Sequence, residues 1–167
     1  SDSTDEIKVQ KKCRKTDAAF YSFMSMTTEG EEVGNGVLTV SSGFEGIDTE
    51  LHLAIKSGYI VINSLDDGMN VNKDDVSVLA IEGGSITINA ALGSEGDGID
   101  SNGFVRIDGG VLNVNGIRVP DNAVDSYSGV YYNEGIVNID GLSQDLEPGS
   151  VQGAIGNVGP EVFVDRT

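Results

Sequence analysis

Four short turns in this chain place oxygen-bearing side chains on either side of a small residue. They are Glu45-Gly46-Ile47-Asp48, Asp67-Gly68-Met69-Asn70, Asp97-Gly98-Ile99-Asp100 and, with a departure from the pattern, Asn122-Ala123-Val124-Asp125. Carboxylate and amide oxygens are the ligands that calcium prefers. Zinc and copper favour His and Cys, which these turns lack. The chemistry that the turns predict is therefore calcium binding.

Stacking these turns one above another would bring their carboxylates close together. At a strand spacing of roughly 4.8 Å, each pair repels by about 3–4 kcal/mol at an effective dielectric constant of about 20. A cation between the coils removes this repulsion and links the coils. Solvated turns without an ion are the alternative, because Asp, Asn and Gly form turns by themselves. The predicted calcium ligands are Asp48, Asp67, Asn70, Asp97, Asp100, Asn102 and Asp125.

The segments that must position these turns also repeat. Each turn is followed by a short apolar run, at residues 51–55, 76–81, 104–107 and 130–132. A glycine-led segment then follows, at residues 59–63, 85–89, 111–115 and 136–140. The glycines before it stand at positions 58, 84, 110 and 135, with spacings of 26, 26 and 25. So regular an interval is typical of solenoid proteins.

These segments have the pattern of β-strands. Residues 85–89 alternate apolar and polar side chains, and β-branched residues stand between glycines. Strands this close in sequence leave no room for crossover helices. The sequence predicts an all-β, right-handed, single-stranded parallel β-helix of about four coils with a period of about 26 residues. Residues 1–35 are expected to form a basic arm and cap, 36–140 the β-helix body, and 141–167 a tail or cap with a late strand.

Charge and composition restrict the partners of the chain. The formal net charge is -17, with 27 acidic against 10 basic residues. Such a surface repels nucleic acids, so we expect no nucleic-acid partner. The apolar stretches are too short to span a membrane. The single cysteine, Cys13, cannot form an internal disulfide.

Two further groups of side chains are candidates for binding a saccharide. Tyr127, Tyr131 and Tyr132 could stack against sugar rings, or pack beneath the C-terminal tail instead. Arg106 could contact an acidic sugar, or balance the negative charge around it. It is also the one plausible base for a uronate lyase, an activity that the chain is not expected to have.

A longer motif resembles a known family. Residues 96–103, with Ile107-Asp108-Gly109-Gly110 after them, resemble bacterial carbohydrate-binding domain-containing proteins, and residues 67–70 and 81–88 look like earlier coils of the same family. The resemblance covers roughly residues 37–140. It implies a pectate-lyase-like right-handed β-helix with calcium between coils, secreted or anchored at the cell surface. It also implies binding to plant-type polysaccharides, including acidic ones.

The predicted function is therefore that of an extracellular, calcium-binding β-helix that binds polysaccharide at the cell surface. The alternative is a filament subunit that pairs with further copies of itself. In that case the apolar segment 20–26 or the late strand 161–165 would complete the coil of a neighbouring copy, because the open ends of a β-helix invite strand pairing. Otherwise, the segment 20–26 caps its own coil.

Overall fold

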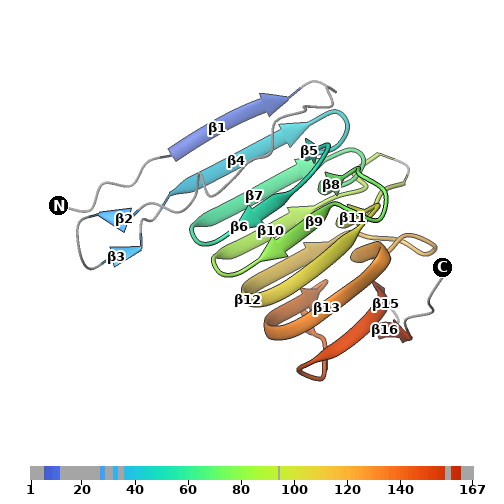
Figure 1. Ribbon diagram of the computed structural model, residues 1–167. Coiled ribbons are helices and arrows are strands. Elements are labelled where there is room, and N and C mark those ends of the chain that lie inside the picture. The colour runs from blue at the N-terminus through green and yellow to red at the C-terminus, as the bar shows by residue number, and fades with distance from the viewer. Residues whose placement is uncertain are drawn as a thin grey trace.

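The computed structural model describes residues 6–11, 27–28, 32–33, 36–93, 95–156 and 159–162, with side chains for 36–93 and 95–156. In these residues the chain is all-β, and its parallel strands wind into a solenoid of about four turns (Figure 1). The predicted fold class and the repeat of about 26 residues are confirmed. The described residues include no helix that is long and apolar enough to cross a membrane.

Three parallel sheets form the sides of the solenoid. The first sheet has the longest strands, and their register places Val37 beside Tyr59, Tyr59 beside Ser85, Ser85 beside Val111 and Val111 beside Ile136. Its strands are β1 (Glu6–Lys11), β4 (Val37–Ser42), β7 (Tyr59–Ser64), β10 (Ser85–Asn89), the end of β12 (Phe104–Asn115) and the end of β13 (Val124–Ile139).

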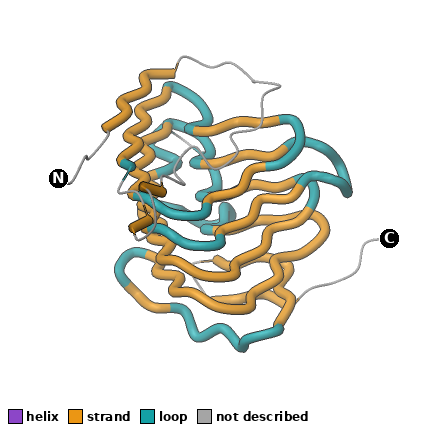
Figure 2. The backbone as a smooth tube through the Cα atoms, turned by 60° about the vertical axis from the view of Figure 1, so that its left-hand side comes forward, coloured by secondary structure: helices purple, strands orange, loops and turns teal. Residues whose placement is uncertain are grey.

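The second and third sheets have shorter strands. The second contains β5 (Ile47–Thr49), β8 (Met69–Val71), β11 (Ile99–Ser101) and the start of β13. The third contains β6 (Leu53–Ile55), β9 (Val78–Ile81), the start of β12 and the middle of β13. In Figure 2 the strands lie one above another, with loops at the corners between sheets.

The two ends of the solenoid differ from the regular coils. Strand β1 pairs in parallel with β4, so part of the predicted N-terminal arm extends the first sheet. At the other end, β14 (Leu142–Ser143) and β15 (Ser150–Gly156) pair antiparallel with β13. The hairpin partners β2 (Thr27–Thr28) and β3 (Glu32–Val33) form a separate small sheet.

The C-terminal region contains more strand than the sequence predicts. For residues 141–167 the sequence predicts one late strand, but β14 and β15 precede it, because antiparallel pairing does not need the repeat pattern. Strand β16 (Gly159–Val162) overlaps the predicted late strand and pairs with β15 of its own chain. The apolar segment 20–26 lies outside the described residues.

Alternating side chains fill the interior. Along β10, Ile86 and Ile88 are fully buried, while the residues on either side of each are partly exposed. The residues after each small turn residue also form a buried apolar row, as their equivalent positions predict. These are Ile47, Met69, Ile99 and Val124, none more than 3% exposed.

The regular glycines are required by the backbone at the corner between the third and first sheets. Gly58, Gly84, Gly110 and Gly135 all have positive φ, between 78° and 116°. A Cβ atom at Gly84 would lie 2.9 Å from the carbonyl oxygen of Gly58. Only glycine combines a positive φ with the absence of a Cβ atom, so a glycine recurs once per coil at this corner.

The loops at the other corners vary in length but compensate for one another. Between β7 and β9 the two loops have four and six residues, at 65–68 and 72–77. One coil later they have nine and two residues, at 90–98 and 102–103. The repeat thus stays near 26 residues, while the second-sheet strands start at positions 47, 69 and 99.

Candidate functional site

The acidic turns stack in register along the second sheet. Asp48 lies beside Asn70, Asn70 beside Asp100, and Asp100 beside Asp125. We call these four outward positions the acidic row. Asp67, Asp97 and Asn122, which precede the small residues, form a second row that we call the turn row. The predicted alignment of the four turns is therefore confirmed.

Close approach of the backbone explains why the turns contain glycine. A Cβ atom at Gly68 would lie 2.3 Å from Ile88 Cγ2 and 2.4 Å from the carbonyl oxygen of Gly98. The amide nitrogens of Gly68 and Gly98 instead donate to the carbonyl oxygens of Asp97 (2.9 Å) and Asn122 (3.0 Å) in the next coil. These contacts bring the flanking aspartates of successive coils together.

Carboxylates of the turn row bond from one coil to the next. The backbone nitrogen of Asp97 donates to Asp67 Oδ1 over 2.7 Å, and the backbone nitrogen of Asn122 donates to Asp97 Oδ1. Burial nevertheless raises the pKa of Asp67 and of Asp97 to about 7, and neighbouring aspartates add to the rise. Burial, followed by the charge of Asp125, also raises the pKa of Asp100.

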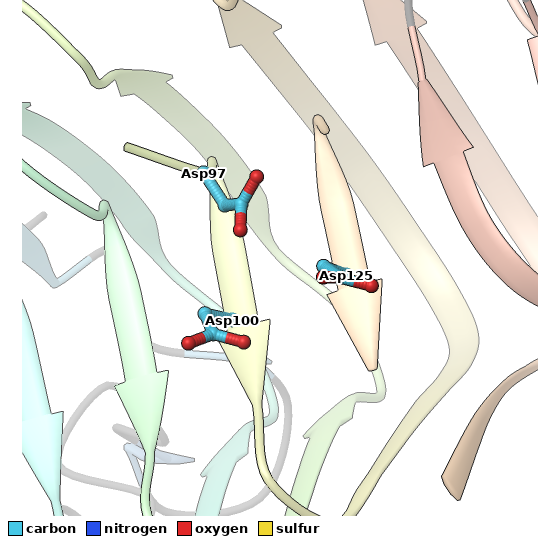
Figure 3. A group of neighbouring side chains, drawn as sticks. All are labelled: Asp97, Asp100 and Asp125. Atoms are coloured by element: carbon cyan, nitrogen blue, oxygen red, sulfur yellow. The ribbon is translucent and has the colours of Figure 1, made fainter. Parts of the chain in front are cut away.

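Three of the predicted ligands meet in one cluster. One carboxylate oxygen from each of Asp97, Asp100 and Asp125 lies within 4.8 Å of the others (Figure 3). Asn70, beside Asp100 in the acidic row, has a buried Oδ1 without a hydrogen-bond donor. Three clustered carboxylates, with an orphaned acceptor on the neighbour of one of them, fit a hard cation such as calcium, which takes oxygen ligands alone.

The other predicted ligands have contacts outside the three-carboxylate cluster. Asp48 is only 5% exposed, and the side-chain amide of Asn72 donates to its Oδ1. Asn102 lies at the corner between the second and third sheets, where its amide donates to the carbonyl oxygen of Asn72 over 3.1 Å. Asp48 is not a member of the carboxylate cluster, whereas Asp67 approaches it by accepting a hydrogen bond from the backbone nitrogen of Asp97.

A pocket of about 190 Å³ opens at this same corner. It is lined by Asp74, Asp75, Asn102 and Tyr127, and the Tyr127 side chain is 45% exposed. The backbone nitrogen of Asp75 donates to the carbonyl oxygen of Asn102 (2.9 Å), and Ser128 Oγ donates to Asp75 Oδ1 (3.0 Å). Three successive coils thus build the pocket and hold its walls together.

Sequence reasoning did not include Asp74 and Asp75 among the site residues. They belong to the six-residue loop 72–77, where the next coil has only residues 102–103. Asp75 also has a positive φ of 56°, which is uncommon for a residue other than glycine. An acidic pair in a loop longer than its equivalent in the next coil is the signal that could have found them.

The three tyrosines do not form one cluster. Strand alternation puts Tyr131 and Tyr132 on opposite sides of β13. Tyr132 is 9% exposed, and its hydroxyl donates to the carbonyl oxygen of Gly135 over 2.7 Å, so it has no ring face for a sugar. Tyr131 packs on Phe104 with 6.0 Å between ring centroids. Only Tyr127 lines the pocket.

Arg106 lies on the third sheet, away from the pocket. Its Nη2 lies 3.3 Å from Glu82 Oε1, and its Nε bonds to Asp108 Oδ2. Asn133 also donates to Asp108, over 2.7 Å. These contacts agree with the interpretation of Arg106 as a residue that balances nearby negative charge.

The model of a family described as "Carbohydrate-binding domain-containing protein" matches residues 1–155. The chain belongs to this family. Its match extends beyond the resemblance over residues 37–140 on both sides, and so includes β1 and most of β15. No curated protein and no solved structure matches the chain.

Proposed function

We propose that this protein binds a saccharide in the pocket beside Tyr127. The observation that supports this proposal is the exposed ring of Tyr127, flanked by Asp74, Asp75 and Asn102. A sugar has an apolar C–H face and a rim of hydroxyl groups. The ring of Tyr127 suits the first, while carboxylate and amide oxygens accept hydrogen bonds from the second. Family membership supports a saccharide as the ligand.

The proposal includes calcium, held by Asp97, Asp100 and Asp125 with the orphaned oxygen of Asn70 nearby. A bound calcium ion would supply positive charge that links neighbouring coils. Asp100 and Asp125 each stand two residues before a pocket residue, Asn102 and Tyr127. Two residues along a strand span roughly 7 Å. Fixing the carboxylates would therefore also fix the turns that form the pocket.

The acidic side chains of the pocket restrict the class of saccharide that we propose as its ligand. Asp74 and Asp75 favour hydroxyl donors and disfavour a uronate, whose carboxylate they repel. We propose binding without catalysis, since the guanidinium of Arg106 is held between two carboxylates and does not suit a base. The proposed setting is extracellular or at the cell surface, where calcium modules work with dissociation constants of about 10⁻⁴–10⁻³ M.

Calorimetric titration with a panel of soluble neutral and acidic oligosaccharides tests the pocket. A neutral oligosaccharide should bind, and Tyr127→Ala should weaken it about tenfold because ring stacking is lost. The matched control is Tyr131→Ala, which removes another exposed tyrosine from β13 but lies outside the pocket, and it should change the affinity less than about twofold. Equal losses in the two variants, or no binding by any oligosaccharide, would contradict the proposal.

A further inference from the structure

The outward side of the first sheet carries no charge between β4 and β13, in a chain whose net charge is -17. We call this side the flat face. With 22% charged residues in the whole chain, about three of fourteen positions would be charged by composition alone. None is. The fourteen outward residues are Val37, Thr39, Ser41, Tyr59, Val61, Asn63, Ser85, Thr87, Asn89, Val111, Asn113, Asn115, Ile136 and Asn138.

Amide side chains on the flat face are held in fixed positions. Asn89 Nδ2 donates to Asn63 Oδ1 over 2.9 Å, and Asn115 Nδ2 donates to Asn89 Oδ1 over 3.1 Å. In the neighbouring row, Asn138 Nδ2 donates to Asn113 Oδ1 over 2.9 Å. Each amide still has polar capacity for a partner, because it has two N–H donors and two lone pairs. Side chains fixed in advance lose little further freedom when a ligand binds.

The size of the flat face decides between two kinds of partner. Five strands at a spacing of about 4.8 Å and some six residues at about 3.3 Å give roughly 480 Å². A stable protein interface needs about 800 Å² on each partner, so a second copy of this chain would be held weakly. An extended glycan chain requires less area. An uncharged glycan also loses no charge solvation when it docks there.

We propose that the flat face is a docking surface for an uncharged, extended polysaccharide, with Tyr59 against sugar rings and the asparagine rows against hydroxyl groups. This inference rests on the proposed carbohydrate function but uses a different part of the molecule. The first sheet lies opposite the corner that holds the pocket, because that corner joins the second and third sheets. One straight glycan chain therefore cannot occupy both places.

Co-sedimentation with particles of insoluble, uncharged β-1,4-glucan tests the flat face. Thr87→Glu puts a carboxylate at its centre, where binding would strip the charge of water, so retention should fall about tenfold. Leu142→Glu is the matched control, with the same change in net charge at a side chain 71% exposed outside the face, and its retention should stay within about twofold of the parent. Tyr59→Ala, at a side chain 54% exposed, should lower retention without affecting the fold.

Thermal melting of each variant verifies that it is folded. Parent-like retention of both folded flat-face variants, Thr87→Glu and Tyr59→Ala, would overturn the inference. If, in that case, oligosaccharide binding in the pocket still depends on Tyr127, the proposed function is retained and only docking on the flat face is rejected. If the protein binds neither the particles nor any oligosaccharide, both the flat-face docking and the proposed pocket function are rejected. Ultracentrifugation could also show that the parent is a dimer and that Thr87→Glu dissociates it. That result would assign the flat face to a second copy of the chain and overturn the proposal that a glycan docks there.

Discussion

The first and second sheets have the same parallel backbone but stack opposite kinds of side chain. On the first sheet, Asn63, Asn89 and Asn115 bond to one another along the row. On the second, Asp100 stands between Asp125 and Asn70, and the Oδ1 of Asn70 has no donor. An amide is both donor and acceptor, whereas a carboxylate only accepts. A repeated asparagine therefore satisfies itself, and a repeated aspartate needs a donor or a cation from elsewhere.

The largest expected effect comes from pushing apart the coils of the second sheet. Gly68→Ala would place a methyl group 2.3 Å from Ile88 Cγ2 and 2.4 Å from the carbonyl oxygen of Gly98. Overpacking of this kind should lower the free energy of unfolding by about 3 kcal/mol, as measured by chemical denaturation. Gly43→Ala is the control, since its new methyl group would meet nothing within 4 Å. Similar losses in both variants would contradict the close packing of the turns.

Calcium should stabilise the second sheet. At a concentration 100 times its dissociation constant, the ion would add about 2.7 kcal/mol to the free energy of unfolding, which raises the melting temperature by roughly 5–10 °C. Asp100→Asn should lose most of this rise. Glu134→Gln, which removes an exposed acidic side chain outside the cluster, should keep it. If chelation leaves the melting temperature of the parent unchanged, the acidic row consists of turn residues alone.

Without calcium, stability should depend on pH through the turn row. The pKa of Asp67 and of Asp97 is about 7 in the folded chain, against an ordinary value of 3.8. Because the folded state holds these protons more tightly, their contribution is complete below about pH 4 and is lost as the pH rises to about 7. Melting in chelator from pH 4 to 8 should show this decline, and Asp97→Asn should reduce it. A variant that declines as steeply as the parent would contradict the assignment.

A smaller effect is expected on the first sheet. Asn89→Ala removes the amide between Asn63 and Asn115, which should cost about 1 kcal/mol in the free energy of unfolding. Asn89→Asp keeps an acceptor for Asn115 but has no N–H for Asn63, so it should be at least as costly at neutral pH. Calcium should change neither loss. A calcium-dependent loss in Asn89→Ala would mean that the two sheets respond to the ion alike.

The features that sequence predicted are those that each coil must repeat. Gly84 and Gly110 recur because the corner requires positive φ, and the buried positions of Met69 and Ile99 follow from the same register. The shared turn motif, aligned on its small residue, was enough to predict the acidic row, although the turns themselves are 22, 30 and 25 residues apart. The alignment did not reveal which of its members meet, because Asn72 bonds to Asp48 and draws it into a different contact.

The features that sequence missed depend on what does not repeat. The pocket exists because one coil has the six-residue loop 72–77, whose Asp75 reaches Ser128 two coils away. Tyr131 and Tyr132 looked equivalent as neighbours, yet alternation exposes one and buries the other. Strand β1 pairs with β4 across 31 residues, a spacing outside the repeat, so no periodicity indicated it.

Hydrogen–deuterium exchange with and without calcium tests most directly the claim that the two sheets differ in their need for a cation. Calcium should slow exchange in the peptides that contain 97–101 and 122–126 on the second sheet. It should leave peptides covering 85–89 and 111–115 on the first sheet almost unchanged, because their asparagine rows are already satisfied. Equal slowing in both sheets, or no slowing in either, would contradict the account.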